Sequence, residues 1–137
     1  MYTSDIDRNR SKAAKTALVY LMISTFCALF GAIYEVYSHE VYSFYMIYAF
    51  AFPLVGGALS FLLLHIAGAA HYPGVVSRHL FHCGIATLTV GSIIQGVVEI
   101  YGTTNSLTAW YWRVGAVLIV AGSIAFLFQR KQDKESD

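Results

Sequence analysis

Three ionisable side chains stand within or beside long apolar stretches of the sequence: Glu35, Glu99 and Arg113. Ionisable groups are costly in such places, so they usually face the interior of a helix bundle or a water-filled cavity. Glu99 and Arg113 stand about one turn from the facing ends of two consecutive apolar stretches, so we expect them to form an ion pair. Glu35 would then have no partner of its own and could titrate or bind a cation.

Aromatic residues lie close to these three groups in the sequence. A carboxylate beside Tyr or Trp rings is suited to an organic cation, because the ring faces also attract positive charge. The alternative is an interfacial belt, in which the rings sit at the level of the lipid headgroups without a ligand. The candidate ligand-binding residues are Glu35, Glu99, Arg113, Tyr34, Tyr37, Tyr101 and Trp112.

A group of histidines offers a different chemistry. His79 with His82, and His79 with Cys83, have the i,i+3 and i,i+4 spacings that place two ligands on one helix face. His65 is expected at the depth of His82 on an adjacent helix, so the two could hold a transition metal or a b-type haem, with His71 in the loop between. The alternative is interfacial, partly solvated histidines with Cys83 packed as a small hydrophobe. We favour no cofactor and keep haem b or a transition metal as alternatives.

Membrane-spanning helices must position these side chains. The chain has 137 residues, of which 57% are hydrophobic and 12% charged, whereas soluble domains are about a quarter charged. Four stretches reach the roughly 20 apolar residues needed to cross a bilayer, and lipid leaves no partner for unpaired backbone groups, so each should be a helix. The expected spans are 17–36, 42–66, 80–100 and 110–128. Pro53 is expected to kink the second span.

The expected fold is therefore an all-α integral membrane protein with one four-helix domain, residues 17–128, flanked by tails at 1–16 and 129–137. The connections on one side are short, which predicts two antiparallel helix hairpins. Nine Lys and Arg against eight Asp and Glu leave little net charge, which gives no support for a nucleic-acid partner.

The basic residues predict the direction of the spans. Both tails and the connection between the second and third spans hold all but one of the Lys and Arg residues. The positive-inside rule then places both termini in the cytoplasm of a multi-pass cell-membrane protein. The residues concerned are Arg8, Arg10, Lys12, Lys15, Arg78, Arg130, Lys131 and Lys134.

The first and third spans resemble each other at an offset of 64 residues. In each, a Thr is followed at steps of three, four and three by two small residues and a Glu, all on one helix face. A parallel internal repeat would bring Glu35 and Glu99 to a shared cavity, as in some transporters; coincidence between generic membrane helices is the alternative. The matching sets are Thr25, Ala28, Ala32 and Glu35, and Thr89, Ser92, Gly96 and Glu99.

Three functions are compatible with these patterns. The one we favour is a small membrane protein that binds, or helps transport, a small solute or cation through an outward-facing polar and aromatic site. The alternatives are a haem or metal-binding redox protein that uses His65 and His82, and an accessory subunit of a larger membrane complex. No nucleophile-elbow, Walker or dinucleotide motif is present in the sequence, which favours a protein that is not an enzyme. The expected partners are the lipid bilayer and a second copy of the chain or another membrane protein.

Overall fold

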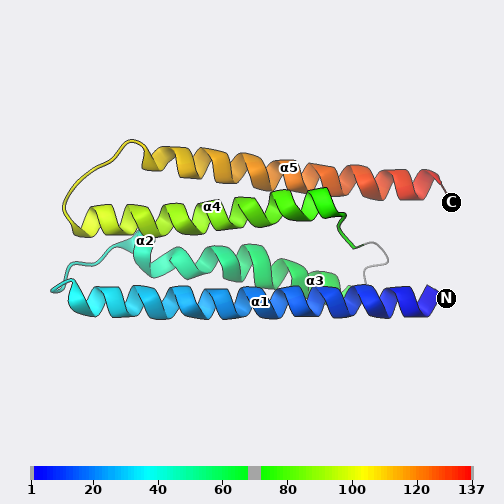
Figure 1. Cartoon of the computed structure of the whole chain (residues 1–137), viewed down its shortest axis with the longest axis horizontal. Helices are drawn as coiled ribbons and strands as arrows, with labels where there is room; N and C mark the ends of the chain where they lie inside the picture. The colour runs from blue at the N-terminus through cyan, green and yellow to red at the C-terminus, as the bar shows by residue number, and fades with distance from the viewer. Residues whose placement is uncertain (1, 68–71, 137) are drawn as a thin grey trace.

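The computed structural model of the chain describes residues 2–67 and 72–136. All regular structure in these two ranges is helical, and Figure 1 shows the helices lying along a common long axis. Four segments are long and apolar enough to cross a membrane, and they contain the expected spans, except that the second begins at Phe44. These segments are Thr3–Tyr37, Phe44–Ile66, Val75–Ile100 and Thr108–Glu135.

The first and last helices continue well beyond the apolar stretches. Helix α1 runs over Tyr2–Tyr37 and helix α5 over Thr108–Glu135, so most of both polar flanks is helical. Surface ion pairs at helical spacing support these extensions: Arg8 with Asp5 at 2.8 Å, and Lys131 with Glu135 at 4.0 Å.

The second span is irregular, whereas α1, α4 (Val75–Ile100) and α5 are continuous α-helices. It consists of α2 (Phe44–Ile47), the 3₁₀ turn η1 (Tyr48–Phe50), the π-helix η2 (Phe52–Leu59) and α3 (Ser60–Ile66). Proline lacks a backbone N–H and its ring clashes with the carbonyl of the preceding turn, so Pro53 prevents a regular α-helix here. In the 3₁₀ turn η1 and the π-helix η2, backbone groups that cannot form α-helical hydrogen bonds near Pro53 can form hydrogen bonds of other spacings.

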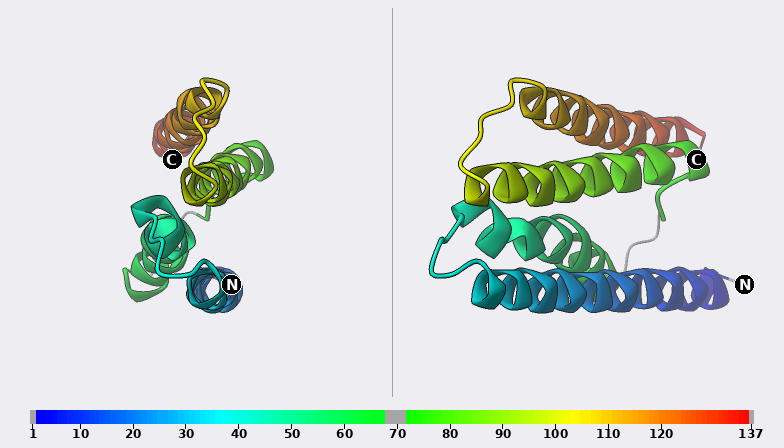
Figure 2. Two further views of the ribbon diagram at one scale, coloured as in Figure 1. Left: turned by 90° about the vertical axis from the view of Figure 1, so that its left-hand side faces the viewer. Right: turned by 60° about the vertical axis from the view of Figure 1, so that its left-hand side comes forward.

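The spans form an open row and do not close into a square bundle. Helix α1 packs on the second span, the second span on α4, and α4 along α5. Figure 2 shows this order in its end-on view. Among the described residues, no Cα atom of α1 lies within 8 Å of a Cα atom of α4 or α5. The second span therefore keeps the backbones of the first and third spans apart, and α1 and α4 reach each other only through side chains.

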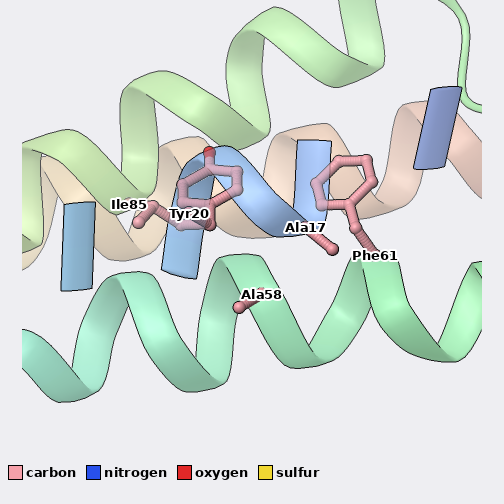
Figure 3. Packing of buried hydrophobic residues seen from close by; sticks show 5 residues of the cluster. All are labelled: Ala17, Tyr20, Ala58, Phe61 and Ile85. Atoms are coloured by element: carbon pink, nitrogen blue, oxygen red, sulfur yellow. The ribbon is translucent and has the colours of Figure 1, made fainter. Parts of the chain in front are cut away.

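A small core joins the first three members of this row. Figure 3 shows Ala17 and Tyr20 from α1, Ala58 and Phe61 from the second span, and Ile85 from α4. Most large apolar side chains lie outside this core; Phe26 and Val117, for example, are 67% and 66% exposed. Such a surface suits a hydrocarbon environment, where exposed apolar side chains have no cost of hydration.

Helices α4 and α5 approach each other most closely where glycines face the partner helix. A Cβ atom added at Gly84 would lie 2.5 Å from the side chain of Ile119 and 3.0 Å from the carbonyl oxygen of Gly115. A Cβ atom at Gly122 would lie 2.8 Å from the backbone nitrogen of Phe81. Small residues allow membrane helices this approach, and the Ser77 hydroxyl adds a hydrogen bond to the Gly122 carbonyl at 2.7 Å.

Candidate functional site

The C-terminal ends of α1 and α4 lie at the same end of the molecule, opposite the chain termini (Figure 1). A hollow of about 400 Å³ lies between them, and Tyr34, Tyr37 and Tyr101 line it. Ser38, His39 and Ile100 complete the lining. Three of the aromatic residues assigned to the outer site therefore surround one space, and we name it the outer hollow.

Two glycines bring the helices that carry the carboxylates against α2. A Cβ atom at Gly31 of α1 would lie 3.0 Å from the Met46 carbonyl oxygen, and one at Gly96 of α4 would lie 2.8 Å from the Met46 Cβ. Met46 is thus held between α1 and α4 and is 1% exposed. Glu35 follows Gly31 by four residues and Glu99 follows Gly96 by three, so each carboxylate is on the helix face that packs on α2.

The two carboxylates differ in their hydrogen bonds. The Ser43 hydroxyl, which is buried just before α2, donates a hydrogen bond of 2.6 Å to Glu99 Oε2. Glu35 Oε1 is buried and has no hydrogen-bond partner among the described residues. A buried carboxylate oxygen without a donor is unfavourable, and a bound cation or a proton would offset that cost.

The expected ion pair between Glu99 and Arg113 does not form in the described part of the chain. Arg113 is exposed, and its guanidinium carbon lies 5.3 Å from the centre of the Trp110 ring, in a cation–π contact. Glu99 is engaged by Ser43 instead. Sequence distance suggested that the two side chains share a depth, but it could not show that they point in different directions.

Trp112 also lies away from the outer hollow. Its ring packs against Tyr45 and Phe52 of the second span, with centroid distances of 5.8 and 5.5 Å. The structure therefore places Tyr34, Tyr37 and Tyr101 together, puts Glu35 and Glu99 on the faces toward α2, and leaves Arg113 and Trp112 outside this group.

The two faces of the suspected repeat do not meet. On α4, Thr89, Ser92 and Gly96 are buried; the Ser92 hydroxyl donates a 2.6 Å hydrogen bond to the Tyr45 carbonyl. The corresponding α1 positions Thr25, Ala28 and Ala32 are exposed. The buried face of α1 is a different one, made by Ala13, Ala17, Tyr20, Ser24, Cys27 and Gly31.

The candidate metal ligands are dispersed. His79 and Cys83 are exposed, and His71 lies outside the described residues. His65 Nδ1 interacts with the Arg10 carbonyl at 3.0 Å and lines a groove between α1 and the second span. His82 lines a different groove, between α1 and α4. Among the described residues, no three His, Cys, Asp or Glu side chains are grouped to hold one metal ion.

The sequence analysis missed two polar contacts in the interior. The Tyr20 hydroxyl and His82 Nδ1 are hydrogen-bonded, and both rings lie against Phe61. Ser43 stands before a helix, where a serine usually caps that helix, yet its hydroxyl goes to Glu99. The contact between Tyr20 and His82 could have been suspected from the sequence, because Tyr20 is a tyrosine on a face of the first span that is rich in alanine. No residue near Ser43 in the sequence indicated its contact with Glu99.

In the part of the chain that the structure describes, four apolar helical segments of membrane-spanning length indicate a multi-pass membrane protein. Comparison with known protein families, with characterised proteins and with solved structures finds no match to this chain.

Proposed function

We propose that this protein binds a small organic cation in the outer hollow and thereby takes part in moving such a solute across the membrane. The observation that carries the proposal is that Tyr34, Tyr37 and Tyr101 line one hollow, at the end of the molecule where a buried oxygen of Glu35 has no hydrogen-bond partner among the described residues. Tyrosine rings attract a cation through their faces, and a nearby carboxylate supplies the opposite charge.

Transport would need more than one chain. The spans form an open row, so a single copy supplies one wall of any pathway rather than a closed lumen. We infer a homodimer, with two antiparallel hairpins in each copy and both termini in the cytoplasm, as the basic residues favour. The outer hollow would then open to the extracellular side.

A binding measurement tests the site with tetraethylammonium as the probe. In isothermal titration of the detergent-purified protein, Tyr37→Leu should weaken binding about two- to fivefold, since Tyr37 is exposed and a cation–π contact at an exposed site contributes about 0.5–1 kcal/mol. Tyr42→Leu is the matched control, because Tyr42 is an exposed tyrosine near the same end that does not line the hollow. Equal losses in the two variants, or no binding by the unaltered protein, would favour the interfacial-belt alternative.

The carboxylate has its own matched pair of variants. Glu35→Gln should weaken tetraethylammonium binding more than Glu40→Gln, because Glu40 lies in the exposed connection after α1. If both changes act equally, the charge acts at long range and Glu35 is not part of the site.

Labelling in intact cells tests the orientation. In a chain whose two native cysteines are replaced, Asn105→Cys should react with an impermeant thiol reagent and Lys134→Cys should not. The opposite result would place the outer hollow on the cytoplasmic side.

A further inference from the structure

A groove runs between α1 and α4 where the second span holds these helices apart. Its volume is about 580 Å³, and Pro53 of the second span lies between its two walls. Val19 and Ile23 of α1 face Ile85 and Val90 of α4 across it. We name this space the α1–α4 groove; it is separate from the outer hollow in its residues and in its place along α1.

The polar lining of the α1–α4 groove gathers at one end. Helices α1 and α4 run in the same direction (Figure 1), so Lys15 and Thr16 lie at the same end as His82, and Ile23 and Val90 lie farther along. This polar end is the one at which both chain termini lie. Thr89, which lines the apolar part, directs its hydroxyl to the Ile85 carbonyl of its own helix at 2.8 Å.

Positive charge dominates the polar end. Lys15 is exposed there, and among the described residues no carboxylate lines the groove. Thr16 lies 3.3 Å from the Tyr72 hydroxyl, and the guanidinium carbon of Arg78 lies 5.7 Å from the centre of the Tyr72 ring. This chain of contacts places a second cation beside the same end.

The length of the groove fits half of a bilayer. Eight residues separate Lys15 from Ile23, which is about 12 Å along a helix, and one leaflet contributes about 15 Å of hydrocarbon. A molecule that matches the groove has an anionic head at the level of Lys15 and one apolar chain directed toward the bilayer centre.

We propose that the α1–α4 groove is a binding site for an anionic phospholipid of the leaflet at which the termini lie, with its phosphate at Lys15 and one acyl chain over Pro53. A second groove of similar volume, about 520 Å³, lies between α1 and the second span. Its lining includes His65 but no Lys or Arg. Arg10 lies beside it, but the Arg10 Nε already donates a hydrogen bond of 3.2 Å to the His65 carbonyl, so this groove has no lysine or arginine in its wall to retain an anionic headgroup.

Native mass spectrometry of the full chain in neutral detergent tests the headgroup. Phosphatidylglycerol should remain bound in preference to phosphatidylcholine with the same acyl chains. Lys15→Gln should lower the affinity for phosphatidylglycerol about fivefold, which corresponds to one basic residue at an anionic lipid surface. Lys12→Gln is the matched control, because Lys12 is exposed on α1 and does not line the groove. Equal affinity for the two lipids, or equal effects of the two lysine changes, would overturn the proposal.

A second pair of variants tests the acyl chain. Ala86→Phe should fill the α1–α4 groove and reduce phosphatidylglycerol binding, whereas Ala14→Phe should fill the second groove and leave it unchanged. Circular dichroism and elution volume establish that both variants are folded. Loss of binding in Ala14→Phe alone would place the lipid in the second groove. If millimolar inorganic phosphate competed as strongly as the lipid does, the ligand would be a free anion and not a phospholipid.

Discussion

The two ends of the helix row are held together in different ways. Between α4 and α5 the backbones touch: Gly84 and Gly122 lie so close to the partner helix that an added Cβ would meet backbone atoms at 2.8 Å. Between α1 and η2, a side chain fills the gap, because the Tyr20 ring occupies the space over Gly57. Helix α1 approaches the backbone of the second span at α2 instead, where a Cβ at Gly31 would lie 3.0 Å from the Met46 carbonyl oxygen. Ser24 adds a hydrogen bond of 3.0 Å to the Phe50 carbonyl, next to the irregular part of the second span.

This difference shows which contact can adjust. Apolar side chains gain little by leaving lipid for one another, so close packing and hydrogen bonds decide how membrane helices associate. Backbone-to-backbone packing leaves no movable group at the contact, whereas a tyrosine ring can rotate. We therefore expect α4 and α5 to be the rigid pair, and the α1 side to tolerate change.

The largest effect is expected at the rigid pair. Gly122→Val would force a Cβ to within 2.8 Å of the Phe81 nitrogen and 3.0 Å of the Ser77 carbonyl oxygen. The free energy of unfolding, measured by denaturation in mixed detergent micelles, should fall by about 3 kcal/mol. Ala116→Val, at an exposed site on the same helix, should change it by less than about 0.5 kcal/mol. A small loss in Gly122→Val would contradict the close backbone packing.

A smaller and rescuable effect is expected on the α1 side. Gly57→Ala places a methyl group on the Tyr20 ring, which must move, at a cost of about 2 kcal/mol. Because the obstacle is a side chain, the same change should cost much less in a Tyr20→Ala background. A double-mutant cycle on unfolding measures this coupling. Additive losses would mean that Tyr20 does not fill the gap over Gly57.

The contact that anchors Glu99 comes next in size. Ser43→Ala should lower the free energy of unfolding by about 1 kcal/mol, since it removes the donor to the Glu99 carboxylate. A cycle between Ser43→Ala and Glu99→Gln should show coupling. The corresponding cycle between Glu99→Gln and Arg113→Ala should be additive, because the described residues show no ion pair between these two. Coupling between Glu99→Gln and Arg113→Ala would mean that these two side chains form an ion pair after all.

The smallest effect isolates one hydroxyl group. Tyr20→Phe keeps the ring against Phe61 and loses only the hydrogen bond to His82. Hydrogen bonds between membrane helices contribute about 0.6 kcal/mol on average, so a loss of that size is expected in the same unfolding assay. A loss of several kcal/mol would show that the bond, rather than the ring, holds α1 to α4.

The sequence predicted the number of segments that could span a membrane, and each expected span lies on an observed segment; the first and last segments extend well beyond the expected limits, to Thr3 and to Glu135. It also identified three tyrosines that now line one hollow. Both results come from local information: hydrophobic length sets a span, and aromatic residues gather at span ends.

The order of the helices was beyond the reach of such patterns. The repeat suggested that the matched faces of the first and third spans pack toward a common centre, but the backbones of α1 and α4 do not touch, and the Thr25 face of α1 is exposed. The direction of Arg113 and the partner of Ser43 depend in the same way on which helix lies opposite.

The sequence by itself determined that this protein is helical and rich enough in apolar residues to require a membrane, because length and hydrophobicity alone establish those properties. Tertiary structure decided which face of each helix is buried. In lipid an apolar face gains little from burial, so the choice falls to contacts that no helix contains by itself: Gly122 against Phe81, and Tyr20 over Gly57.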